Sequence, residues 1–200
     1  MSGFTAEWLA LREPYDLAAR NPAVRAAVTA WCKSAVSVDV VDLACGSGAT
    51  VRTLCSHLPA RQHWHLVDHD SELLGLACKS ALANDVTLDA MRLDLSRELD
   101  AALTGPIDLI TTSALLDLVS EGWLYELLHK AAVRALPIYA ALTYDGRIQL
   151  SPVDPLDSPI VAAVNTHQRT DKGFGPALGP TAAPAAIDRL EALGYSIAHG

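Results

Sequence analysis

The hydrophobic positions of the chain follow two different spacings. Short apolar runs rich in β-branched residues predict buried strands, and longer segments with apolar residues three and four apart predict helices. We expect strands at residues 38–44, 63–67, 87–93, 107–112 and 138–143, and helices at 49–58, 71–82, 96–103, 123–134 and 185–193. Strands that alternate with helices predict an α/β fold, a three-layer, doubly wound and mostly parallel sheet.

Both ends of the chain depart from this alternation. Residues 6–33 carry apolar positions at helical spacing, with a break at Pro14 and a restart after Pro22, so we expect two N-terminal helices. Residues 151–184 are rich in proline and poor in apolar runs, which predicts a long loop with one short helix inside it. Gly194 is expected to cap the last helix, and residues 195–197 to start a sixth strand.

Composition excludes several classes of protein. The chain has 200 residues, half of them hydrophobic, with a formal net charge of −8 and no cluster of Lys and Arg, so nucleic acid is an unlikely substrate. No apolar stretch is long enough to span a membrane, and residues 1–4 lack the pattern of a secretion signal, which favours the cytoplasm. The four cysteines form no C-x-x-C pair and the histidines show no metal-ligand spacing, so we expect no metal site. His63 and His65 alternate along a strand and are expected to face one side of it.

The chemistry is concentrated where the first two strands end. Gly46 and Gly48 follow the first strand, and glycines there let the backbone approach a ligand and present amide groups to it. Asp68 ends the next strand about twenty residues later, where a carboxylate accepts the hydroxyls of a ribose. Val51 stands where a dinucleotide-binding turn has a third glycine or alanine, which disfavours a pyrophosphate. The sequence therefore predicts a nucleoside-type pocket.

Four segments, in order, resemble the motifs of class I S-adenosylmethionine-dependent methyltransferases. The run from Val40 to Gly48 is similar to the first motif, D/E-x-G/A-x-G-x-G, with Ala44 at a position where glycine is common. Asp68 resembles the second motif and Asp94 the third, and residues 107–117 resemble the fourth strand and the segment after it. The resemblance covers residues 38–150.

The resemblance implies the fold, the cofactor and the residues that hold it. The cofactor is expected to be S-adenosylmethionine, with S-adenosylhomocysteine as product. Family members typically have seven strands ending in a reversed hairpin, so this chain is expected to be truncated or to belong to a longer product. The expected cofactor-binding residues are Asp42, Ala44, Cys45, Gly46, Ser47, Gly48, Asp68, His69, Asp94, Leu95, Ser113, Ala114, Leu116 and, from the N-terminal segment, Arg20.

Several of these residues have a structural alternative. Asp68 is a candidate helix N-cap, although Ser71 is the better one. Asp94 is a candidate cap for the short helix that follows it, and Asp42 a residue that holds the loop amides without touching the ligand.

Methyl transfer from a sulfonium is an in-line displacement that needs no metal, and it needs a base only when the acceptor arrives protonated. The candidates for catalysis are Asp117, which follows the fourth strand, and His167 in the long loop; a solvated loop position is the alternative for each. The expected substrate-contacting residues are Tyr15, Asp117, His167, Gln168, Lys172 and Phe174.

We expect one methyltransferase domain over residues 1–200, monomeric or homodimeric, acting on a small molecule. Residues 1–35 would form a helical cap, 36–150 the cofactor-binding core, 151–184 a lid or substrate loop, and 185–200 the last helix and the start of the sixth strand. The alternatives are a non-catalytic S-adenosylmethionine-binding or regulatory module and, less favoured, a nicotinamide-dependent oxidoreductase.

Overall fold

The computed structural model describes residues 4–80 and 85–200, which separate into two compact units. The sheet unit comprises the described residues of 4–113, with residues 131–142 and 198–200. The helical unit comprises residues 114–130 and 143–197. Each unit is described by itself.

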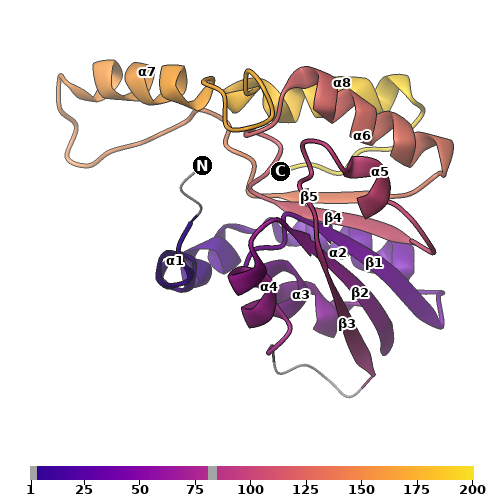
Figure 1. Cartoon of the computed structure of the whole chain (residues 1–200). Helices are drawn as coiled ribbons and strands as arrows, with labels where there is room; N and C mark the ends of the chain where they lie inside the picture. The colour runs from indigo at the N-terminus through magenta and orange to yellow at the C-terminus, as the bar shows by residue number, and fades with distance from the viewer. Residues whose placement is uncertain (1–3, 81–84) are drawn as a thin grey trace. The chain divides into compact units, whose positions relative to one another are not determined.

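The sheet unit is built on five parallel strands in the order β3-β2-β1-β4-β5 (Figure 1). The order reverses at β1, because β2 and β3 continue to one side of it and β4 and β5 to the other. In such sheets a ligand binds beyond the carboxyl ends of the strands at the point of reversal. The predicted parallel α/β sheet is thus confirmed, and its strands are β1 Ser37–Leu43, β2 Arg61–Asp68, β3 Val86–Arg92, β4 Leu109–Ser113 and β5 Ile138–Ala141.

Alternation along the central strands separates the two faces of the sheet. Val38, Val40, Trp64 and Leu66 are buried and belong to one core cluster with residues of α2, α3 and α4. The residues between them on β1 and β2 face the other side. The helices of this unit are α1 Ala6–Ala19, α2 Pro22–Cys32, α3 Ala49–Leu54, the 3-10 turn η1 Cys55–His57, α4 Ser71–Ala77 and α5 Leu99–Ala102.

Two local predictions in this unit were wrong. Helix α1 runs through Pro14 and ends at Ala19, so the break between the N-terminal helices lies at Arg20 and Asn21 rather than at the proline. Asp70, not Ser71, caps α4, because its carboxylate accepts hydrogen bonds from the amides of Glu72 and Leu73. The predicted end of that helix at Leu82 lies outside the described residues.

The helical unit contains α7 Asp157–Gln168, the 3-10 turn η2 Gly179–Thr181, α8 Ala182–Ala192 and most of α6 Glu121–Val133. The predicted loop at 151–184 therefore holds a helix of 12 residues. Gly194 has a φ of +87°, in line with its predicted role after α8. Residues 195–197 form no strand, which corrects the predicted sixth strand. Within the described ranges, no helix is both long enough and apolar enough to cross a membrane.

Candidate functional site

The glycine turn, residues 45–48, lies at the carboxyl end of β1, where the strand order reverses. The amide of Cys45 donates to the carbonyl of Val67 on β2 at 3.0 Å, and the amide of Gly48 closes the turn on the carbonyl of Cys45 at 3.0 Å. Gly46 and Gly48 have φ angles of +53° and +86°, a region that a side chain disfavours. The two glycines therefore allow a turn this tight.

The turn is tied to the end of β2 through Asp68. The amide of Gly46 donates to Asp68 Oδ2 at 2.9 Å, and the amide of Asp70 donates to Asp68 Oδ1 at 3.0 Å. His69 Nδ1 lies 3.2 Å from the same Oδ1. Asp68 is buried, and a carboxylate offers about four acceptor positions, so these contacts leave some of them for ligand hydroxyls. The N-cap alternative for Asp68 does not apply, since Asp70 caps the helix.

Asp42 lies beneath the turn and is fully buried. Thr111 on β4 donates a hydrogen bond from Oγ1 to Asp42 Oδ1 at 2.7 Å, and Oδ2 has no hydrogen-bond partner in the described part of the chain. Burial raises the pKa of Asp42 to about 7, against the opposing effects of the Thr111 hydrogen bond and the charge of Arg20. The structure thus attaches Asp42 to the neighbouring strand.

Arg20 is buried where α1 ends. Its Nη2 donates to Ser113 Oγ at 3.1 Å, at the end of β4, and to Thr50 Oγ1 on α3 at 3.4 Å. Its Nη1 is buried without a hydrogen-bond partner among residues 4–80 and 85–200. A buried guanidinium with a spare donor is suited to an anion, and of the N-terminal candidates it is the one the fold brings to the turn. The side chain of Tyr15 is 75% exposed.

Helix α1 also contacts the glycine turn through Glu13 and Leu9. Glu13 and Arg52 form a bidentate pair, with Nε and Nη2 of Arg52 at 2.7 and 2.8 Å from the two carboxylate oxygens. Arg52 Nη1 also donates to the carbonyl of Ser47 and to Ser80 Oγ. Leu9 Cδ1 lies 3.5 Å from the position of an added Cβ on Gly46. Helix α1 therefore packs directly on the turn.

The third motif forms a local turn. Asp94 Oδ1 accepts hydrogen bonds from the amide and the hydroxyl of Ser96, and the Asp94 amide donates to Glu98 Oε2 at 2.8 Å. The hydrogen bonds to Ser96 lower the pKa of Asp94. Asp94 therefore forms a local turn with Ser96 and does not cap α5, whose N-cap is Glu98. Leu95 beside it is buried, whereas His69 is 62% exposed.

The remaining candidates lie in the helical unit. Asp117 is buried, and its carbonyl accepts from the amide of Gly179 at 2.9 Å. His167 is exposed in the last turn of α7, where Lys172 Nζ donates to its carbonyl at 3.1 Å. Phe174 packs edge-on against Trp123, with ring centroids 5.3 Å apart. Of the remaining residues, Leu116 is buried, whereas Ala114 and Gln168 are half-buried.

Sequence reasoning missed the residues that hold the turn from outside the motifs. Thr111 fixes Asp42, Thr50 contacts Arg20, and Glu13 with Arg52 joins α1 to the turn. Thr111 carried a usable signal, because a hydroxyl inside a buried strand needs a hydrogen-bond partner. The ion pair between Glu13 and Arg52 spans 39 positions and carried no comparable signal.

Comparison with known proteins bears on the domain and the fold. A family model described as a methyltransferase domain matches residues 40–136, from β1 to just before β5, and so includes the glycine turn and Asp68. The five-stranded parallel sheet is consistent with the class I methyltransferase fold, and the match to the methyltransferase domain covers just under half of the chain. The sequence matches no curated protein.

Solved structures share the fold of this chain at low sequence identity. The cyclopropane synthase MmaA2 of Mycobacterium tuberculosis is 12% identical, with a TM-score of 0.56 over 100% of this chain and 65% of its own. Magnesium protoporphyrin IX methyltransferase from Synechocystis PCC 6803, with bound SAH, is 15% identical, with a TM-score of 0.56 over 100% and 81%. A Bordetella parapertussis protein is 19% identical, with a TM-score of 0.55 over 94% and 61%. The chain thus spans less than two-thirds of two of these three proteins.

The residues around the turn fit a nucleoside that carries a charged group. The turn brings two glycines and the Asp68 carboxylate together, and a Cβ on Gly48 would lie 3.1 Å from Ala77 Cβ. Asp42 Oδ2 and Arg20 Nη1 are buried polar atoms without hydrogen-bond partners in the described residues. Unsatisfied buried polar atoms are costly in a folded protein, and a polar ligand that pairs with them removes that cost.

Proposed function

We propose that the chain binds S-adenosylmethionine at the glycine turn and transfers its methyl group to a small-molecule acceptor. The observation that carries this proposal is the hydrogen bond from the amide of Gly46 to Asp68, which joins the ends of β1 and β2 where the strand order reverses. This bond lies within the segment that matches the methyltransferase domain.

Each side chain at the turn has a role in holding the cofactor. The Asp68 carboxylate accepts the ribose hydroxyls with the lone pairs that its backbone contacts leave available. Arg20 holds the carboxylate of the methionine part with its spare Nη1 donor, because Ser113 and Thr50 fix the guanidinium at the end of β4. Leu95, Leu116 and His69 contribute further contacts, following the family resemblance.

Bound S-adenosylmethionine supplies a methyl group on a sulfonium, whose positive charge makes the thioether a good leaving group. The chain has to position the acceptor in line, keep water away and, for a protonated acceptor, take up one proton. Asp117 is the better base of the two candidates because it is buried. His167 is exposed, and its carbonyl takes part in ending α7. We assign His167, Gln168, Lys172, Phe174 and Tyr15 to contact with the acceptor.

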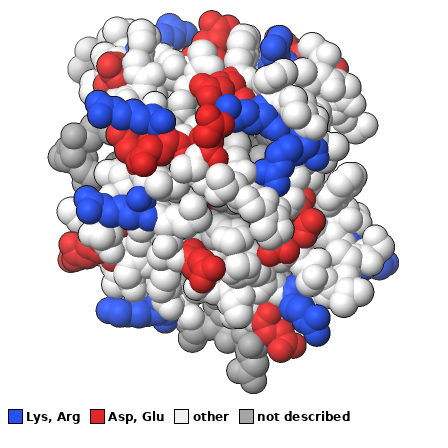
Figure 2. Space-filling view, turned by 45° about the vertical axis from the view of Figure 1, so that its right-hand side comes forward, with Lys and Arg blue, Asp and Glu red and all other residues white. Residues whose placement is uncertain are grey.

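The charge distribution supports a small acceptor over a polyanion. The formal charge is −8, and the face seen in Figure 2 carries acidic and basic side chains side by side, without a broad basic patch. Nucleic-acid binding depends on clustered Lys and Arg that neutralise phosphates. A small molecule requires no such patch.

Calorimetric titration with S-adenosylmethionine, S-adenosylhomocysteine and NAD tests the proposal. We expect binding of the first two and none of NAD. Asp68→Ala should weaken the first two at least tenfold, because a charge-assisted hydrogen bond contributes about 1.5–3 kcal/mol. Asp188→Ala removes an exposed carboxylate on α8 and is the matched control, with unchanged binding. A folded protein that binds neither adenosyl ligand, or an Asp68→Ala variant that binds both undiminished, would contradict the proposal.

Turnover separates an enzyme from a non-catalytic binding module. The protein is incubated with S-adenosylmethionine and a panel of small nucleophiles, and the release of S-adenosylhomocysteine is measured. Acceptor-dependent release above the rate without acceptor supports methyl transfer. Tight binding with no release across N, O, S and C nucleophiles would favour the binding module.

A further inference from the structure

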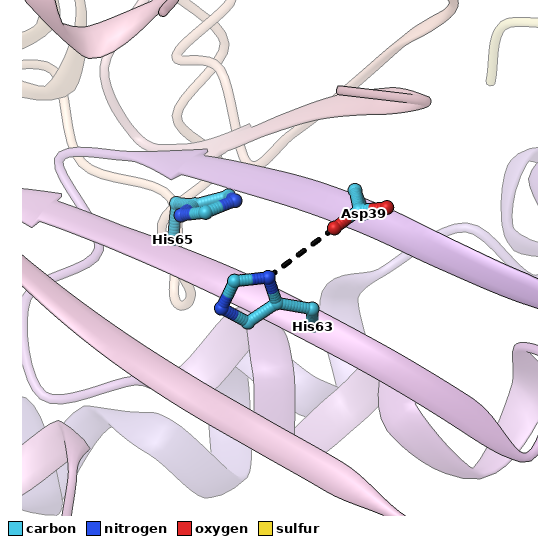
Figure 3. A group of neighbouring side chains, drawn as sticks. All are labelled: Asp39, His63 and His65. Atoms are coloured by element: carbon cyan, nitrogen blue, oxygen red, sulfur yellow. Dashed lines mark hydrogen bonds and ion pairs between the residues drawn. The ribbon is translucent and has the colours of Figure 1, made fainter. Parts of the chain in front are cut away.

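A cluster of two histidines and a carboxylate lies on the face of the sheet that points away from α2, α3 and α4. Asp39 on β1 and His63 and His65 on β2 offer ligand atoms that all lie within 4.8 Å of one another (Figure 3). Asp39 and His63 are register partners on adjacent strands, and His65 lies two residues further along the same face. The cluster is accessible, because the side chains of Asp39 and His63 remain 28% and 35% exposed.

The contacts of His63 place an electron-rich nitrogen against a carboxylate. His63 Nε2 lies 2.9 Å from Asp89 Oδ2 on β3, and His63 Nδ1 lies 3.2 Å from Asp39 Oδ1. In a neutral imidazole one nitrogen carries the proton and the other a lone pair. When the Nε2–H group donates a hydrogen bond to Asp89, the lone pair of Nδ1 faces Asp39 Oδ1. Two electron-rich atoms at that distance require a cation between them, either a second proton or a metal ion.

His65 favours the metal ion. Its ring packs edge-on against His63 with centroids 4.3 Å apart. Its Nε2 is shielded from solvent and has no hydrogen-bond partner among the residues that the structure describes. A second proton on His63 would leave this nitrogen unsatisfied, whereas a metal ion would bind both rings.

We propose that Asp39, His63 and His65 bind one divalent transition-metal ion of the zinc type. Asp89 orients His63 through its contact with Nε2. Two imidazoles and one carboxylate suit zinc, cobalt, nickel or copper better than magnesium or calcium. Zinc bonds to such ligands are about 2.0–2.2 Å long, so the most distant of the three ligand atoms must approach one another by roughly an ångström. Rotation of the half-exposed side chains allows this movement. A carboxylate behind a metal-bound histidine is a common arrangement that fixes the ring and its tautomer.

The site is separate from the glycine turn. Asp39 precedes Cys45 by six residues along β1, a distance of about 20 Å at the rise of a strand. The ion would join β1 to β2. Because its ligands come together only in the folded sheet, the ion would stabilise the fold. The proposal is thus independent of the methyl-transfer function.

Titration of the full, untagged, metal-stripped and reduced chain with Zn²⁺ or Co²⁺ tests the site. The wild-type protein should bind one ion, and a hundredfold excess over the dissociation constant should raise Tm by roughly 5–10 °C. His65→Gln should weaken binding at least tenfold and abolish the rise in Tm. This variant is informative because the described structure gives His65 no hydrogen bond to lose. Asp89→Asn should weaken binding about 10- to 100-fold through the orientation of His63.

His57→Gln is the matched control, because His57 is exposed on η1, outside the cluster. It should bind like the wild type, and Mg²⁺ should neither bind nor raise Tm. The Co²⁺ spectrum should lack thiolate charge-transfer bands, which separates this site from the cysteines. Failure of the wild type to bind, equal binding by a folded His65→Gln variant, or thiolate bands in the spectrum would overturn the proposal.

Discussion

Gly48, at the end of the glycine turn, has no room for a side chain. A Cβ added there would lie 3.1 Å from Ala77 Cβ and 3.2 Å from Ala77 Cα, and the residue has a φ of +86°. Gly105 provides a matched position in the same unit, with a φ of +78° and no atom within 4 Å of an added Cβ. The variants Gly48→Ala and Gly105→Ala therefore share the backbone cost and differ in packing.

The structure sets the size of both effects. An alanine in the left-handed region costs about 1–2 kcal/mol, partly offset by about 0.4–1 kcal/mol from a less flexible unfolded chain. Gly105→Ala should therefore lower the free energy of unfolding by about 1 kcal/mol. At Gly48 the backbone of α4 must also move, and overpacking of this kind costs about a further 1–3 kcal/mol. We expect Gly48→Ala to lose about 2–4 kcal/mol in all.

Urea unfolding followed by circular dichroism measures both variants, and calorimetry with S-adenosylhomocysteine measures the pocket. Gly48→Ala should also bind the ligand more weakly, because a shifted turn misplaces the amide of Gly46, while Gly105→Ala should bind normally. Equal losses of stability in the two variants would refute the packing argument. Unchanged affinity in a destabilised Gly48→Ala would show that the turn does not contact the ligand.

Three further predictions concern the buried polar residues at the turn. The pKa of Asp42 is raised to about 7, so the folded state binds this proton more tightly than the unfolded state does. The free energy of unfolding, relative to that of Asp42→Asn, should therefore fall as pH rises from about 4 to 7, by up to about 1.4 kcal/mol per pH unit. The same pH dependence of urea unfolding in both proteins would contradict this. Thr111→Val should cost about 1–3 kcal/mol in urea unfolding, because it removes the donor to a buried carboxyl group; no loss would contradict it. Calorimetry should show that Arg20→Gln weakens S-adenosylmethionine about 10- to 100-fold and leaves adenosine, which lacks the carboxylate, unaffected; equal weakening of both would count against the assigned contact.

The sheet could be predicted from the sequence because its signals are local. Most residues of the central strands β1 and β4 are apolar or β-branched, and the turn after β1 has glycines at two positions with positive φ. Asp68 was identified for the same reason, since its place at the end of β2 follows from its position in the chain. These features depend on spacing alone, which a single sequence records.

Features that depend on distant partners were not predicted. Helix α1 continues through Pro14, next to Glu13, whose ion pair with Arg52 holds the helix on the turn and compensates for the lost backbone hydrogen bond. Residues 195–197 have strand-like composition but pair with no strand of the described sheet. The histidine cluster was dismissed because ligand spacing was sought along the chain, whereas Asp39 and His63 are neighbours across two strands.

A crystal structure of the chain with S-adenosylhomocysteine would test the central claim most directly. Both ribose hydroxyls should lie within hydrogen-bond distance of the Asp68 carboxylate, and the ligand should lie over Gly46 and Gly48. Ligand bound elsewhere, or at the turn with its ribose turned away from Asp68, would show that the glycine turn and Asp68 do not form the cofactor site.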